Sequence, residues 1–141
     1  MQVKIDTNAK KVSKLLGKQG KELSASLRKA LSITAIKGME IIKDRTDKGR
    51  DKDGGRFVRY SKKYLNFRAN QNKSVPFPTL NFSGKMLGSM TTKANSRRAE
   101  IFFAGAEQSA KALHNDKTRP FFGFSRQEED RLSKVFFGNL K

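Results

Sequence analysis

The chain of 141 residues is long enough for one domain with a single modest core, and because it has no cysteine it can form neither a disulfide framework nor a thiolate metal site. No apolar run approaches the roughly 20 residues of a membrane-spanning helix and the N-terminus lacks a signal-type apolar stretch, so we expect a soluble protein that folds in a reducing cytoplasm. The formal charge of +18 destabilises an isolated compact subunit by self-repulsion, which predicts nucleic acid or an acidic protein surface as a partner.

Two short elements are predicted at the N-terminus. Residues 1–5 alternate apolar and polar side chains, as a short strand does. Asn8 is a suitable N-cap for a helix over residues 10–16, which Gly17 and Gly20 interrupt.

A long amphipathic helix is predicted over residues 21–45, where apolar side chains recur at three- and four-residue spacing. The apolar sector widens toward its C-terminal half, so we expect that half to be buried across a sheet. The basic residues between the apolar rows are interpreted as a solvated face. They are Arg28, Lys29, Lys37 and Lys43.

Residues 46–55 are polar and glycine-rich and predict a loop. The spacing of the three aspartates in this loop is similar to that of a calcium-binding loop. However, Arg56 and Phe57 stand where the pattern needs its closing glutamate, so we do not expect a metal site.

Aromatic and basic side chains are interleaved after this loop. The aromatic residues at helical spacing are Phe57, Tyr60, Tyr64 and Phe67, and the cations among them are Arg59, Lys62, Lys63 and Arg68. Such a pattern suits single-stranded nucleic acid, through stacking and phosphate contacts, and it equally suits an amphipathic helix that docks on a core. Residues 46–79 have little apolar periodicity of their own, so we expect an arm or contact loop that works outside the domain.

A β-hairpin is predicted over residues 83–105. Its strands cover residues 89–94 and 99–104, with turn chemistry at Asn95-Ser96 between them. Because one face of a hairpin must be covered, the helices before and after it are expected to pack on it.

Residues 106–141 are expected to hold two helices with an extended aromatic segment between them. The first covers residues 107–113 and ends at Asn115-Asp116. Residues 119–124 could add an edge strand, in which Phe121 points into the core and Phe122 toward a neighbour, or the reverse. A capping box of Ser125 and Glu128 opens the last helix, which runs to about Phe137.

The sequence offers little catalytic chemistry. His114 is the single histidine, and although Asn115 and Asp116 beside it make a nuclease conceivable, no cluster of converging ligands or nucleophilic triad accompanies it. A histidine that closes a helix is more often structural. No phosphate-binding glycine motif occurs. We expect no enzyme activity and no cofactor.

The order of these features resembles the tail-completion or virion-morphogenesis proteins of Mu-like tailed bacteriophages, which belong with neck and head–tail joining proteins. The resemblance covers about 90 residues. Its motifs are a G-x-D-x-x-G-x-x-F pattern at Gly49, Asp51, Gly54 and Phe57, the run YSKKY, an [ST]-G-x-[LM]-x-x-S element from Ser83 to Ser89, AKALHN, and RPFFGFS before an acidic helix.

The resemblance implies a small α+β subunit of one domain, with a long N-terminal helix packed on a small antiparallel sheet. It implies a ring, expected to be hexameric, between head connector and tail in the virion, assembled from subunits made in the host cytoplasm, with DNA passing through the lumen. Predicted subunit or DNA contacts are Arg59, Tyr60, Lys62, Lys63, Tyr64, Arg68, Phe121 and Phe122. The alternative hypothesis is a stand-alone basic nucleic-acid-binding module.

Overall fold

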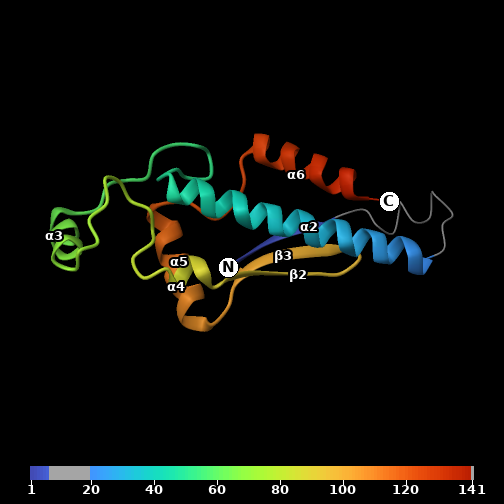
Figure 1. Cartoon of the computed structure of the whole chain (residues 1–141), viewed down its shortest axis with the longest axis horizontal. Helices are drawn as coiled ribbons and strands as arrows, with labels where there is room; N and C mark the ends of the chain where they lie inside the picture. Colours follow the sequence, from blue (N-terminus) through green and yellow to red (C-terminus); the bar gives the residue numbers. More distant parts are fainter. Residues whose placement is uncertain (7–19, 141) are drawn as a thin grey trace.

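The computed structural model describes residues 1–6 and 20–140, which form an α+β fold with a protruding arm (Figure 1). The predicted helix over residues 10–16 lies outside these ranges. The described elements are β1 (Gln2–Asp6), α2 (Gly20–Asp47), α3 (Lys62–Asn70), α4 (Lys85–Gly88), β2 (Met90–Ala94), β3 (Arg98–Phe103), α5 (Ala106–Thr118) and α6 (Arg126–Asn139). The predicted fold class is thereby confirmed.

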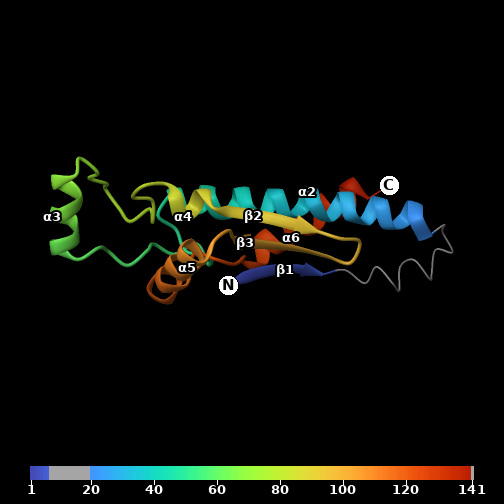
Figure 2. The same ribbon diagram turned by 90° about the horizontal axis from the view of Figure 1, so that it is seen from below.

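The sheet has three antiparallel strands in the order β1-β3-β2 (Figure 2). The predicted hairpin forms β2 and β3, each within about one residue of the expected bounds, and the Asn95 side chain accepts hydrogen bonds from the Arg97 and Arg98 N–H groups in its turn. The short N-terminal strand is also confirmed, since β1 pairs with β3 and makes β3 the central strand.

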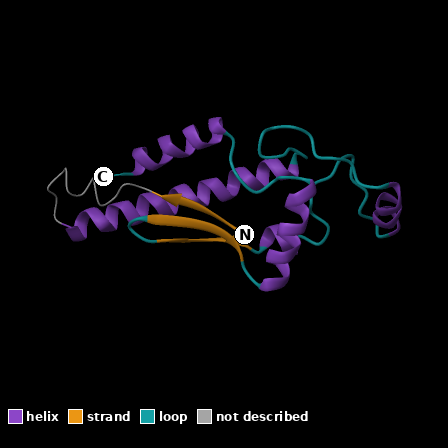
Figure 3. Cartoon of the chain, turned by 180° about the vertical axis from the view of Figure 1, so that it is seen from behind, coloured by secondary structure: helices purple, strands orange, loops and turns teal. Residues whose placement is uncertain are grey.

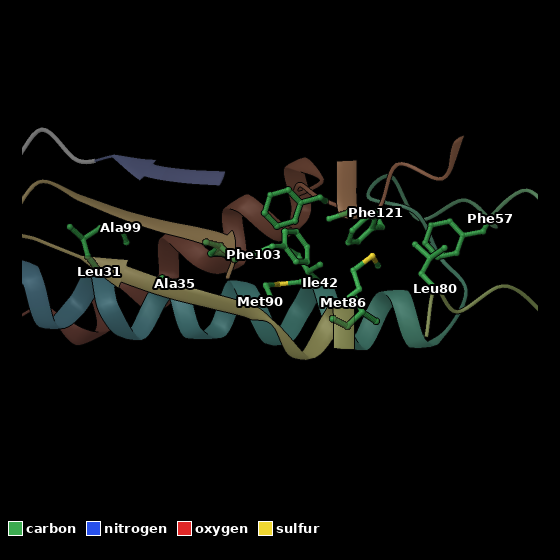
Figure 4. Packing of buried hydrophobic residues seen from close by; sticks show 14 residues of the cluster. Leu31, Ala35, Ile42, Phe57, Leu80, Met86, Met90, Ala99, Phe103 and Phe121 are labelled. Carbon is green, nitrogen blue, oxygen red and sulfur yellow. The ribbon is translucent and has the colours of Figure 1, made fainter. Parts of the chain in front are cut away.

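The core lies between the sheet and α2, which runs along one sheet face (Figure 4). In α2 the side chains of Leu31, Ala35 and Ile42 have no exposed surface, as the predicted apolar sector requires. Helix α6 packs on the side of α2 that faces away from the sheet, so that α2 lies between them (Figure 3). Gly38 of α2 makes room for the Phe124 ring, because a Cβ there would lie 2.8 Å from Phe124 Cζ.

The segment after α5 differs from the prediction. Helix α5 continues to Thr118 instead of ending at Asn115-Asp116, and the Asp116 carboxylate accepts hydrogen bonds from the N–H groups of Phe121 and Phe122. This bond pattern folds the segment into a turn, so it is not an edge strand. Both rings pack on Phe103 and are buried, with 0% and 8% exposure. The expectation that one ring faces a neighbouring subunit is therefore wrong.

A buried ion pair joins α2 to the start of α6. Arg45 Nη1 lies 2.5 and 2.7 Å from the two Glu128 carboxylate oxygens, and its Nη2 donates to the carbonyls of Phe121 and Gly123. The same Glu128 accepts from the Ser125 N–H, which completes the predicted capping box. One carboxylate therefore starts α6 and fixes its position on α2.

The arm extends away from the sheet, with α3 at its far end (Figures 1 and 2). None of the helices in the described part of the chain combines the length and apolar character needed to cross a membrane.

Candidate functional site: the basic arm

The arm, residues 46–79, begins with a closed loop. Gly49 has φ +70° and its carbonyl accepts a hydrogen bond from the Phe57 N–H, while the Asp51 carboxylate accepts from the N–H groups of Asp53 and Gly55. Phe57 is buried in the main core, with 6% exposure. The predicted run of four aromatics on one helix is therefore wrong at its start, because Phe57 serves the core and the helix begins five residues later.

Helix α3 begins at Lys62, where the Ser61 side chain accepts from the Tyr64 N–H. The Tyr64 and Phe67 rings stack at a centroid distance of 6.0 Å, and Phe67 also stacks on Phe82 at 5.7 Å. Tyr60, just before the helix, meets Tyr64 edge to face. The interpretation as a helix is correct for the residues inside α3. The rings of Tyr60, Tyr64, Phe67 and Phe82 pack against one another in series, and we call this group the aromatic column.

Arg68 is the centre of this column. It is 2% exposed, and its guanidinium donates to the carbonyls of Lys73 and Asn81 and to the Tyr64 hydroxyl. It lies within 5.3–5.7 Å of the ring centroids of Tyr60, Tyr64 and Phe82. The prediction that Arg68 contacts DNA or another subunit is wrong, because the arm uses this cation as its own core.

Arg119 attaches the arm to the body. Its guanidinium donates to the carbonyls of Val58 (2.6 Å) and Arg59 (3.0 Å) and stacks over the Tyr60 ring at 4.7 Å. The Tyr60 hydroxyl accepts the N–H of Leu80, which has the strained φ of +56° for a non-glycine residue. The sequence places Arg119 in an aromatic segment and does not indicate this role, since its partners lie about sixty residues away.

A first groove, which we call the root groove, lies where the arm meets α4 and α5. It has a volume of about 540 Å³ and no carboxylate among its lining residues. Its walls include Tyr60, Tyr64, Met86, Gln108 and Arg119. The Gln108 Oε1 atom is buried behind this wall and has no hydrogen-bond partner among the described residues.

Lys111 of α5 also lines the root groove. Its ammonium lies 2.8 Å from the Glu107 carboxylate and lowers the pKa of Glu107, mainly through that hydrogen bond and the charge attraction. The contact is fully exposed, so it positions the Lys111 side chain without adding much stability.

A second groove, which we call the arm groove, lies on the arm itself and has a volume of about 400 Å³. Four cations line it: Lys48, Arg50, Arg56 and Arg59. The remaining wall is largely apolar and is formed by Phe57, Leu65, Val75, Pro76, Phe77 and Pro78.

The other predicted contact residues are distributed over the arm surface. Arg59, Lys62 and Lys63 are exposed, whereas Tyr60 and Tyr64 are half-buried. His114 is exposed on α5. Within the described ranges, no group of three or more His, Cys, Asp or Glu side chains is placed to hold a metal ion.

Comparison of the chain with protein-family models, with curated proteins and with solved structures finds no match.

Proposed function

We propose that this protein is a structural subunit of the bacteriophage neck, a tail-completion or head–tail joining adapter that forms a ring between head connector and tail. The observation that carries the proposal is the arm: it leaves a compact α+β body and exposes apolar side chains outside the core. Those are Val58 (60% exposed), Leu65 (40%), Phe67 (48%) and Phe77 (43%). Exposed apolar groups gathered on a projecting segment are typical of a contact surface.

The sequence patterns that resemble the phage family support the proposal by what they do. Gly49 and Phe57 close the loop at the base of the arm, and Arg119 clamps the carbonyls of Val58 and Arg59. The YSKKY run supplies Tyr60 and the first turn of α3. The loop pattern and the YSKKY run are neighbours in the sequence and Arg119 lies about sixty residues later, and all three attach or shape the arm, as an adapter needs.

The mechanism of such an adapter is geometric. The sheet, α2 and α6 hold the shape of each subunit, while the arm reaches adjacent subunits or the neighbouring neck and tail proteins. A ring of six subunits with a charge of +18 each would suit DNA passing through its lumen and acidic connector surfaces, because complementary charge guides encounter and register. No catalytic step or cofactor is part of this function, and its location is the virion.

The alternative is a nucleic-acid-binding module, which the net charge and the exposed Arg59, Lys62 and Lys63 favour. The aromatic residues count against it. Tyr60 is stacked by Arg119, and Tyr64 belongs to the internal column, so neither ring is presented as a free platform for bases.

The test is assembly, measured by light scattering and electron microscopy of the purified chain and of particles that contain it. We expect discrete rings that form without nucleic acid. The substitution Val58→Asp, at an exposed position of the arm outside the lining of both grooves, is expected to abolish them, while Tyr60→Ala is expected to leave salt-dependent DNA binding unchanged. A protein that stays monomeric and never enters particles refutes the adapter; loss of DNA affinity in Tyr60→Ala supports the alternative.

A further inference from the structure

The arm groove combines unpaired positive charge with an apolar wall. Its lining, as far as the described chain provides it, contains no carboxylate. Lys48 pairs with Asp44 at 2.9 Å and Arg50 donates to the Gly54 carbonyl, whereas Arg56 and Arg59 form no ion pair with a carboxylate of the described residues. Two exposed guanidiniums therefore stand beside the groove without a carboxylate partner among residues 1–6 and 20–140.

The apolar wall is built to stay in place. Phe77 lies against Gly49, where a Cβ would come within 2.5 Å of Phe77 Cδ2, and Pro78 and Phe57 are buried below it. Leu65 of α3 forms the facing side and remains 40% exposed. The volume of about 400 Å³ falls within the range of about 300–1,000 Å³ that is usual for ligand pockets.

This combination fits a protein segment better than a nucleic acid. A nucleic acid would match the cations with phosphates and would need aromatic faces for its bases. The wall instead is mainly leucine, valine and proline. Of the aromatic rings in the lining, Phe57 is buried at 6% exposure and Tyr60 is already stacked by Arg119, which leaves Phe77 alone, 43% exposed, as a face for a base. A peptide that carries both carboxylates and apolar side chains satisfies the cations and the wall together.

The charge also argues against a second copy of this chain as the occupant. The arm, residues 46–79, holds nine basic and three acidic side chains, so two arms would repel each other. We propose that the arm groove binds an acidic peptide segment with apolar side chains, supplied by a different protein. The inference rests on the adapter proposal and names the chemistry of the partner that the arm would hold.

The test uses the full chain and a labelled twelve-residue synthetic peptide of alternating Glu and Leu, with fluorescence anisotropy at 0.15 M NaCl. The double substitution Arg56→Gln and Arg59→Gln should weaken binding about five-fold or more. The matched control is Arg28→Gln with Lys29→Gln, two exposed cations of α2 outside the groove, which should change affinity less than two-fold.

The apolar wall has its own matched pair. Leu65→Asn should weaken peptide binding about three-fold or more, while Leu113→Asn, an exposed leucine of α5 outside the groove, should leave it unchanged. Replacing every Glu of the peptide by Gln should abolish binding to the unaltered chain.

Three outcomes would overturn the inference: no binding of the acidic peptide, equal losses in both double variants, or tighter binding of a twelve-nucleotide oligothymidylate that the groove substitutions weaken instead. Ring formation is measured separately. If rings form but peptide binding does not depend on the groove, this inference is wrong and the adapter proposal remains. If the chain binds the peptide through the groove but never forms rings, the adapter proposal is wrong and the peptide site remains.

Discussion

Glu128 links α2 to the start of α6 through its own hydrogen bonds. Its carboxylate neutralises Arg45 and caps the helix through Ser125. Its side chain is 11% exposed and that of Arg45 is 10% exposed, so water screens the pair poorly.

Glu128→Gln should therefore lower the free energy of unfolding by about 3 kcal/mol, because it leaves the Arg45 charge buried without a counter-charge. Urea denaturation measures the change. The control is Glu129→Gln, one residue later and exposed, which should stay within about 0.5 kcal/mol of the unaltered chain. Equal effects of the two substitutions would mean that the ion pair contributes nothing beyond the cap.

Glu107 offers a test of local electrostatics. Because Lys111 lowers its pKa, Lys111→Gln should raise that pKa toward the ordinary value for glutamate. Carboxyl-carbon NMR titration follows it directly. A lowered pKa contributes stability above the unfolded-state pKa, and this contribution is lost as the pH falls through the folded-state pKa. Lys117→Gln, in the last turn of α5, is the control and should leave the pKa of Glu107 unchanged.

At the scale of elements, the arm behaves as a unit with its own core. That core consists of the Arg68 guanidinium and the aromatic rings around it, and not of a cluster of aliphatic side chains. Lys73 adds to it, since its ammonium donates to the Phe82 carbonyl at 2.6 Å and lies 4.5 Å from the centroid of that ring. The arm is thus stabilised by polar and cation–π contacts that the main core does not share.

Arg68→Met should consequently open the arm and leave the body intact. It removes three hydrogen bonds and the cation–π contacts, together about 3 kcal/mol of local stability. We expect hydrogen exchange of α3 amides to rise by about a hundred-fold, with β2, β3 and α2 unchanged. Lys62→Met, with the same loss of charge at an exposed site, should not do this. Equal acceleration in the sheet would show that arm and body unfold together.

Gly49→Ala tests the base of the arm. The φ of +70° costs a non-glycine residue about 1–2 kcal/mol, and the added Cβ would lie 2.5 Å from Phe77. We expect a loss of at least about 2 kcal/mol in urea denaturation. Gly88→Ala in α4 is a fair control, since a Cβ there meets nothing within 4 Å and its stability should change little. A Gly49→Ala chain as stable as the control would mean that Phe77 moves aside without cost.

The sequence predicts well whatever depends on neighbours along the chain. The α2 stripe, the Asn95 turn and the Ser125–Glu128 capping box all follow from local spacing. It fails where partners lie far apart. Arg68 has the spacing of a solvent-facing cation, but its acceptors include a carbonyl thirteen residues later.

The same limit applies to the turn after α5 and to both grooves. From its neighbours along the chain, Asp116 is expected to end a helix. In the structure its carboxylate accepts hydrogen bonds from the N–H groups of Phe121 and Phe122, and the turn that these bonds form places both rings in the core. The arm groove joins the loop after α2 to residues near Pro76, and no periodicity relates these segments. The charge of the sequence predicts that a basic surface exists, but it does not predict where the arm groove lies.

At the scale of the whole molecule, the dominant feature is uncompensated positive charge. The described ion pairs of Lys37, Lys48, Lys93 and Lys111 are exposed on the lysine side and contribute little. The chain therefore folds against its own repulsion whenever no anionic partner is bound.

Thermal stability should for that reason rise with NaCl. Between 20 mM and 500 mM salt the screening length falls from about 20 Å to about 4 Å, so repulsion between exposed cations weakens over most of the surface. We expect the Tm to rise by about 4 °C or more, which corresponds to roughly 1 kcal/mol for a domain of this size. Differential scanning calorimetry measures it, and a Tm that is flat or falls with salt would contradict the idea of self-repulsion.

Where the repulsion resides can be found with the same measurement. Replacing Arg56, Arg59, Lys62 and Lys63 by Gln removes four charges and lowers +18 to +14. If the arm holds most of the repulsion, this chain should gain stability at low salt and lose most of its salt response. If the rise of the Tm with salt is unchanged in this variant, the repulsion is spread over α2 and the sheet, and the arm cations do not destabilise the isolated subunit. Only the first result ties the instability of the free chain to the surface that a partner would cover.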